Sequence, residues 1–117
     1  MLIDDNESIR DIIDKILTKN GFKAIIAKNT DEAQLLFNEN KINLLISDII
    51  MPKMSGQELA ELLKSKNPYL KVLFIIGYDK YHADFSGKYM VLQKPFRAEE
   101  LLRAILTRRL IDFYWFY

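Results

Sequence analysis

Apolar residues recur along this chain with two periods, one typical of helices and one typical of strands. Helical spacing, in which every third or fourth residue is apolar, occurs in 9–17, 33–37, 59–63 and from about Ala98 onward. Asn29 with Glu32 and Ser55 with Glu58 stand at capping positions for the second and third of these helices, and Gly21 marks the end of the first. The pattern therefore predicts four amphipathic helices.

Between the helices lie short apolar runs of the length of strands. They are Met1–Ile3, 22–27 (FKAIIA), 43–47 (NLLIS), 70–76 (LKVLFII) and 88–92 (KYMVL). Strands that alternate with helices at this spacing predict an α/β fold, in which a single doubly wound, five-stranded parallel sheet carries helices on both faces. Two parts fit less well, because the first strand is very short and 77–87 has only weak helical periodicity. We expect that segment to form a short helix or partly a loop.

Composition narrows the class of protein. The 117 residues suit one domain, 1–117, and half of them are hydrophobic. A net charge of +1 gives no electrostatic field strong enough to favour binding to nucleic acid or to an anionic membrane. The absence of cysteine fits a reducing compartment. No apolar run is long enough to span a bilayer. We therefore expect a cytoplasmic protein that binds neither nucleic acid nor membranes.

Charged residues follow the predicted strands. Asp4 and Asp5 end the first strand, Asp48 ends the third, and Lys94 comes shortly after the fifth. In a doubly wound sheet the carboxyl ends of the strands form the ligand-binding edge, so these four side chains should converge there. Clustered carboxylates repel one another unless a cation compensates them. Oxygen ligands without nearby His or Cys favour Mg²⁺, or Mn²⁺, and a carboxylate beside a metal and a lysine can accept a phosphoryl group.

Three motifs then resemble those of a known family. "IDDN" near the start, "SDIIMPKMSG" in the middle and "LQKPF" near the end resemble, in order and separation, the signatures of response-regulator receiver domains. These are the CheY-like phosphoacceptor modules of two-component signalling. The resemblance covers essentially the whole chain, and it implies a flavodoxin-like fold with strand order 2-1-3-4-5.

The resemblance also implies roles for individual residues and partners. Asp48 would be the phosphoacceptor, and Lys94 would bind the phosphoryl group. The metal would be held by Asp5, Asp48 and the backbone carbonyl of Ile50, while Asp4 would act through metal-bound water. The Lys94–Pro95 peptide bond would be cis. The phosphoryl group would come from a histidine kinase or a phosphotransfer protein, and the signal would pass on by protein–protein contact in a phosphorelay. Such a module is not an enzyme. An aspartate-nucleophile phosphatase would need an acid at position 50, where this chain has Ile50.

Two positions depart from the family pattern. Receivers usually carry Ser or Thr where this chain has Ile76, and an aromatic residue where it has Val91. Isoleucine cannot donate a hydrogen bond to a phosphoryl oxygen. The span from Ile76 to Lys94 is also shorter than usual, with the deficit in 77–87. The alternative function is therefore a pseudo-receiver, a binding module whose contacts depend weakly or not at all on phosphorylation.

The chain ends in an unusual aromatic run, with 112–117 reading DFYWFY. One interpretation is that some of these residues pack on the domain and the rest are a linker remnant. The other is a surface for self-association, because exposed apolar clusters of this size tend to be covered. Candidate surfaces for a homodimer are thus the fourth helix (77–87), the fifth helix (from about Ala98) and this aromatic tail.

Overall fold

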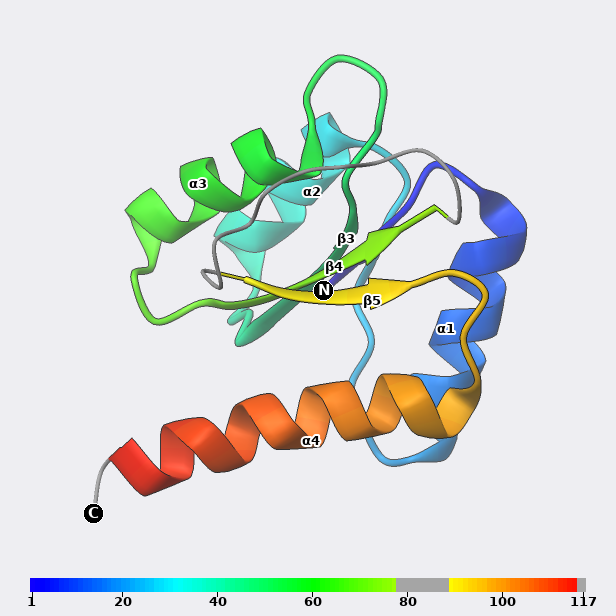
Figure 1. Ribbon diagram of the computed structural model, residues 1–117. Helices are drawn as coiled ribbons and strands as arrows, with labels where there is room; N and C mark the ends of the chain where they lie inside the picture. The colour runs from blue at the N-terminus through cyan, green and yellow to red at the C-terminus, as the bar shows by residue number, and fades with distance from the viewer. Residues whose placement is uncertain (78–88, 116–117) are drawn as a thin grey trace.

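The computed structural model describes residues 1–77 and 89–115, with side chains described up to residue 106 (Figure 1). The elements along the chain are β1 (Leu2–Ile3), α1 (Glu7–Lys19), β2 (Ile26–Ala27), α2 (Thr30–Glu39), β3 (Leu44–Asp48), α3 (Gly56–Lys66), β4 (Lys71–Ile76), β5 (Met90–Gln93) and α4 (Ala98–Trp115). The strands form one parallel sheet in the order β2-β1-β3-β4-β5. The predicted fold class and strand order are confirmed.

Side chains that alternate along each strand divide the core into two layers. Leu45 and Phe74 face α2 and α3, whereas Ile46 and Leu73 face α1 and α4. Figure 1 shows the two helix pairs on opposite faces of the sheet. Burying each of these large apolar side chains contributes roughly 1.5–3 kcal/mol, so both layers hold the strands in register.

The helix starts follow the capping residues that the sequence predicted. The Ser55 hydroxyl accepts a hydrogen bond from the Glu58 amide at 3.1 Å, and the Glu58 carboxylate accepts one from the Ser55 amide at 3.3 Å, which completes the capping box of α3. Asn29 caps α2 by accepting from the Glu32 amide at 2.8 Å. Gly21 follows the end of α1 with φ of 85°, a conformation that glycine adopts without strain.

The second strand is shorter than predicted. The run 22–27 alternates as expected, since Phe22, Ala24 and Ile26 all pack toward the α1 and α4 layer. Only Ile26 and Ala27 form a strand, because β1 offers just Leu2 and Ile3 as partners. The predicted alternation of side chains is therefore confirmed, but the neighbouring strand β1 limits the length of the hydrogen-bonded ladder.

The last helix begins at Ala98, as predicted, and reaches into the aromatic run at the end of the chain. The backbone of α4 stays helical from Ala98 through Trp115, and it extends beyond the sheet in Figure 1. Most of the segment 77–87, for which we expected a short helix or loop, lies outside the described residues, as do Phe116 and Tyr117. Within the described part of the chain, no helix combines the length and the apolar character needed to cross a bilayer.

Gly56 allows the start of α3 to approach the end of β3. A Cβ atom built at this position would collide with the backbone carbonyl oxygen of Asp48 and stand 3.0 Å from the Cα atom of Ile49. The Gly56 amide also donates to the Ile49 carbonyl at 2.7 Å. This close approach holds the loop after Asp48 tightly against the strand end.

We expect Gly56→Ala to lower the free energy of unfolding by about 1–3 kcal/mol, or the Tm by roughly 5–15 °C, because the backbone at Asp48 must move. Thermal unfolding followed by circular dichroism measures the change. Gly77→Ala is the matched control, since a Cβ there meets nothing within 4 Å. Equal losses in the two variants would contradict the close-approach argument.

Candidate functional site

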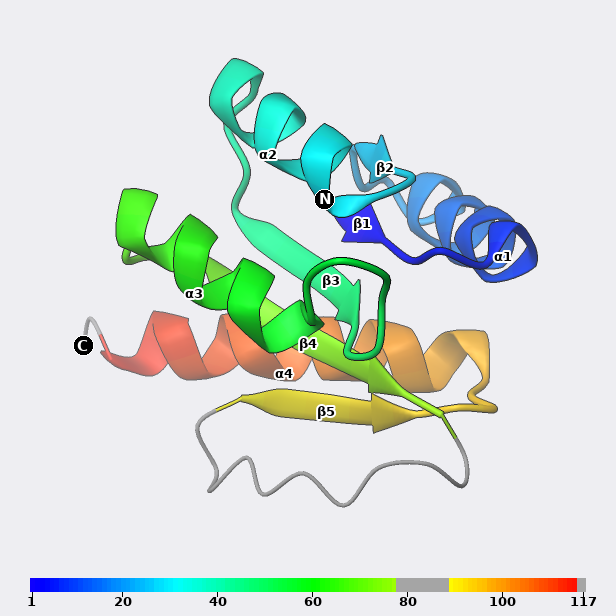
Figure 2. The same cartoon turned by 90° about the horizontal axis from the view of Figure 1, so that it is seen from above.

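The carboxyl ends of β1, β3 and β5 bring the predicted charged residues together. Ile3 pairs with Ser47, so the next residues on the two strands, Asp4 and Asp48, end side by side. One carboxylate oxygen from each of Asp4, Asp5 and Asp48 lies within 4.8 Å of the others. Figure 2 shows β3, β4 and β5 running in the same direction toward this edge of the sheet.

Lys94 bridges two of these carboxylates from the end of β5. Its Nζ atom lies 3.3 Å from Oδ2 of Asp4 and 3.4 Å from Oδ2 of Asp48. The exposed fractions of the three side chains are 22% for Lys94, 1% for Asp4 and 14% for Asp48, so water screens these ion pairs less than it would at the surface. One ammonium group thus compensates two partly desolvated carboxylates.

Asp4 is the buried member of the cluster. Burial raises the pKa of its carboxyl above 3.8, the Asn6 amide and Lys94 act in the opposite direction, and the Asp48 charge adds to the increase. The Asn6 amide donates to Oδ1 at 2.8 Å, and the Arg10 guanidinium donates to the backbone carbonyl of Asp4 at 2.7 Å. Asp4 is therefore held in place, and burial makes its charged form less favourable than that of an exposed aspartate.

Asp48 is accessible and is oriented by its own loop. The Ile50 amide donates to Oδ1 of Asp48 at 3.3 Å, while Oδ2 faces Lys94. The buried Ser47 hydroxyl donates to the backbone carbonyl of Asp48 at 2.7 Å. These contacts fix the backbone of the residue and leave its carboxylate at the edge of the sheet.

Two contributors were missed by the sequence analysis. Arg10 holds the Asp4 carbonyl from the first turns of α1, and Gly56 packs against the Asp48 carbonyl. An arginine early in a helix is common, so nothing in the sequence indicated that the Arg10 side chain would bind the carbonyl group of a residue six positions earlier. The position of Gly56 could have been informative, because a glycine directly after the capping serine is a poor helix former and therefore indicates a steric requirement.

The two atypical positions lie next to the site. Ile76 ends β4, and its carbonyl accepts a hydrogen bond from the Lys94 amide at 2.8 Å. Val91 lies on β5, and both side chains are partly buried against the layer formed with α2 and α3. The Lys94–Pro95 peptide bond is cis. Neither apolar side chain can donate a hydrogen bond toward Asp48.

The donor set suits a hard divalent cation. Three carboxylates converge, and no sulfur or imidazole ligand accompanies them in the described cluster. Asp5 is exposed, so a cation there would retain water ligands, as Mg²⁺ commonly does. The residues that are present therefore fit Mg²⁺.

Comparison with known proteins gives a consistent result. The family model for the response regulator receiver domain matches residues 1–106. The response regulator receiver protein CpdR of Brucella abortus is 32% identical over 109 residues, which cover 90% of this chain and 91% of that protein. The probable transcriptional regulator ycf29 of Porphyra purpurea is 37% identical, and the match covers 90% of this chain but 53% of ycf29. The structure of the Vibrio cholerae chemotaxis protein CheY4 superimposes with a TM-score of 0.81 at 25% identity, covering 91% of this chain and 93% of CheY4.

The raised pKa of Asp4 leads to a prediction about stability without metal. The folded protein binds the proton on the Asp4 carboxyl group more tightly than the unfolded chain does. Protonated Asp4 therefore stabilises the fold fully below pH 3.8, and this stabilisation is lost as the pH rises through the folded-state pKa. In EDTA, we expect Asp4→Asn to gain in Tm relative to wild type as pH rises from about 3 to 7. Thermal melts across this range measure the difference.

Asp31→Asn is the control, because Asp31 is a largely exposed carboxylate that pairs with Lys53 and is not one of the three clustered carboxylates. It accounts for the general effect of removing one negative charge. A Tm difference for Asp4→Asn that follows the same pH course as that of Asp31→Asn would contradict the assignment.

Proposed function

Since the chain belongs to the response regulator receiver domain family, we propose that Asp48 accepts a phosphoryl group with the help of Mg²⁺ and that the signal passes on by protein–protein contact. Receiver domains are signalling modules that interact with kinases or phosphotransfer proteins. A histidine kinase or a phosphotransfer protein is accordingly the proposed donor for this chain.

The observation that carries the proposal is the Lys94 bridge between Asp4 and Asp48, with the Asp5 carboxylate close by. In phosphoryl transfer, an Asp48 carboxylate oxygen forms a bond to phosphorus, and the P–N bond of phosphohistidine, or the P–O bond of acetyl phosphate, breaks. The bonding electrons leave with the donor. The Lys94 ammonium is placed to neutralise charge on the transferred phosphoryl oxygens.

The acidic cluster is the proposed metal site. Asp5, Asp48 and the Ile50 carbonyl would bind Mg²⁺ directly, and Asp4 would act through a bound water. When bound, the cation would supply positive charge to the phosphoryl oxygens in transfer. The burial of Asp4 fits an outer position, because its remaining contacts are to the Asn6 amide and Lys94.

Ile76 and Val91 support a second candidate, the pseudo-receiver. A phosphoryl group on Asp48 would have no hydroxyl partner at position 76, so phosphorylation would favour an active conformation less strongly. The intact Asp4, Asp48 and Lys94 cluster opposes this candidate. The two functions differ in whether Asp48 is phosphorylated and in how far the fold then responds.

The first test is direct phosphorylation. Incubation with acetyl phosphate and Mg²⁺ should add one phosphoryl group, detected as a mass increase of about 80 Da by intact-mass spectrometry, because a carboxylate nucleophile with a lysine and a cation suffices for transfer. Asp48→Asn should abolish the adduct. Asp5→Ala or EDTA should reduce it at least roughly tenfold, since Mg²⁺ binding needs the carboxylate.

Asp31→Asn again serves as the control, because it removes a carboxylate from α2 outside the cluster. It should be phosphorylated like wild type. An unmodified wild-type protein, under conditions that modify another receiver domain, would favour the pseudo-receiver. An adduct that survives in Asp48→Asn would place the acceptor elsewhere.

The second test addresses the conformational response. A beryllofluoride mimic of the phosphoryl group should shift the backbone amides of β4 and β5 only weakly in wild type and more strongly in Ile76→Thr/Val91→Tyr. A hydrogen bond to a charged group is worth roughly 1.5–3 kcal/mol, or about 10- to 150-fold in a two-state equilibrium. Two-dimensional amide NMR spectra measure the shifts.

Ile76→Val/Val91→Tyr is the matched control, because it changes the same positions without supplying a hydroxyl group at position 76. It should respond like wild type. Large shifts in the wild type itself, or equal shifts in the two double variants, would contradict the role given to position 76.

A further inference from the structure

Arg10 lies at the end of the first turn of α1 and contacts the acidic cluster from outside it. Its guanidinium donates a hydrogen bond at 2.7 Å to the backbone carbonyl of Asp4. Among the described residues, no carboxylate lies within ion-pair distance of Arg10. The guanidinium therefore serves a backbone group and not a salt bridge.

The Asp4 carbonyl lies past the end of the hydrogen-bond ladder of the sheet. β1 pairs with its two neighbours only through Leu2 and Ile3. Asp4 is nevertheless buried, and a buried carbonyl group without a hydrogen-bond partner is unfavourable. Arg10 supplies this partner from six residues farther along the chain. The Arg10 side chain thus does for Asp4 what a neighbouring strand does for Leu2 and Ile3.

The contact to the Asp4 carbonyl also determines where Asp5 points. The carbonyl of Asp4 and the amide of Asp5 belong to one planar peptide unit, so holding the carbonyl fixes the direction in which Asp5 leaves the strand. The Asn6 amide holds the same turn by donating to Oδ1 of Asp4 at 2.8 Å. The Asp5 carboxylate makes no hydrogen bond or ion pair within the described part of the chain. Its position therefore depends on the backbone that Arg10 holds.

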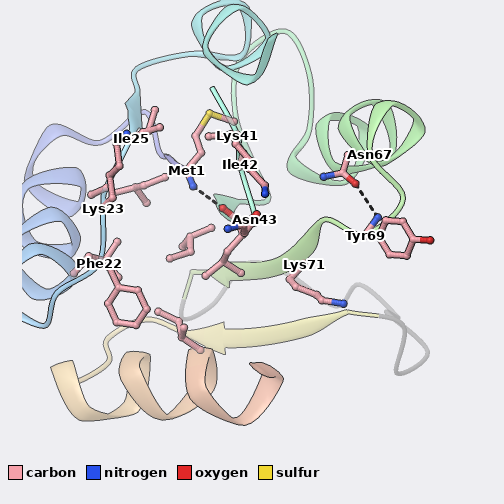
Figure 3. Close-up of a pocket in the computed structure, with 16 residues that line it drawn as sticks. Met1, Phe22, Lys23, Ile25, Lys41, Ile42, Asn43, Asn67, Tyr69 and Lys71 are labelled. Atoms are coloured by element: carbon pink, nitrogen blue, oxygen red, sulfur yellow. Dashed lines mark hydrogen bonds between the residues drawn. The ribbon is translucent and has the colours of Figure 1, made fainter. Parts of the chain in front are cut away.

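Arg10 does not itself line the two cavities found at the ends of β1. The smaller one, of about 170 Å³, has Asp5 among its lining residues. The larger one, of about 700 Å³, lies at the opposite edge of the sheet, where Figure 3 shows Lys23 and Ile25 on one side and Lys41 across from them. An effect of Arg10 on a ligand at the acidic cluster would thus pass through the Asp4–Asp5 peptide unit.

We propose that Arg10 is a positioning residue for Asp5 and thereby sets the affinity of the acidic cluster for Mg²⁺. This inference rests on the proposed function, because it takes the clustered carboxylates as the metal site. Mg²⁺ requires nearly ideal octahedral geometry, so a small displacement of one ligand weakens its binding. Asp48 keeps its own contacts to the Ile50 amide and to Gly56. Arg10 should therefore affect metal affinity more than phosphoryl transfer to the metal-loaded protein.

The positive charge of Arg10 would have the opposite effect on Mg²⁺. Its guanidinium is a cation next to the acidic cluster, so electrostatics alone predicts that removing it strengthens the binding of another cation. Positioning of Asp5 predicts that the same change weakens binding. The sign of the change in Mg²⁺ affinity therefore distinguishes the two roles.

The test is a titration with MgCl₂ followed by backbone amide NMR. Arg10→Met, which loses the donor, should bind Mg²⁺ at least about fivefold more weakly than wild type. Arg10→Lys keeps the charge and one donor on a flexible stem, so it should bind about two- to threefold more weakly. Lys15→Gln is the matched control, because Lys15 is an exposed cation on α1 whose side chain has no polar partner among the described residues. It should bind Mg²⁺ like wild type.

Phosphorylation by acetyl phosphate provides a second readout. In Arg10→Met, the Mg²⁺ concentration that gives half the maximal rate should rise by the same factor as the dissociation constant, while the rate at saturating Mg²⁺ stays within about twofold of wild type. An equal loss of rate at saturating Mg²⁺ would show a general structural effect and would overturn the proposal.

The Mg²⁺ titration separates this inference from the proposed function. Unchanged or tighter Mg²⁺ binding in Arg10→Met would overturn the role of Arg10 and leave the proposed function intact. A wild-type protein that does not bind Mg²⁺ would overturn both. If Arg10→Met does not fold, Arg10→Lys decides, and a Mg²⁺ affinity equal to that of wild type would overturn the proposal.

Discussion

The candidate site depends on one interaction, the bridge from Lys94 to the carboxylates of Asp4 and Asp48. The lysine lies 90 residues from Asp4 in sequence, so the contact between them requires that the sheet bring β1 and β5 to a common edge. Without it, two partly buried carboxylates would face each other uncompensated, and burial already raises the pKa of Asp4. The site therefore exists only in the complete fold. The free energy gained by burying the apolar layers on both faces of the sheet offsets the free energy cost of holding these carboxylates together.

These layers position the site with little freedom. Asp48 pairs with Ile75, whose side chain is buried between β4 and the helices α1 and α4. On the other side, Gly56 keeps α3 against the Asp48 carbonyl. The carboxylate that faces Lys94 is thus attached to backbone that cannot shift without disturbing close packing. Precise placement of this kind is what a nucleophile requires, because transfer depends on geometry more than on the reactivity of a carboxylate.

The sequence predicted the features that follow from local patterns. Alternation and helical spacing identified both layers of the core, and the Ser55–Glu58 pair identified the start of α3. Charged residues at strand ends identified the cluster, because parallel strands must end at a common edge. What could not be predicted depends on partners far away in the chain. The ladder of β2 is limited by β1, and the Arg10 contact to the Asp4 carbonyl depends on how α1 leaves the sheet.

β1 leads directly into two members of the acidic cluster. Its two paired residues, Leu2 and Ile3, are followed by Asp4 and Asp5. A strand with so few ladder bonds has little intrinsic stability, and its position rests mainly on the burial of Leu2 and Ile3. A cation bound at the acidic cluster would restrict the motion of β1, because Asp4 and Asp5 follow directly from this strand. This restriction needs no rearrangement of the core, since ordering one end of a short strand reduces the entropy that its other end still has to lose.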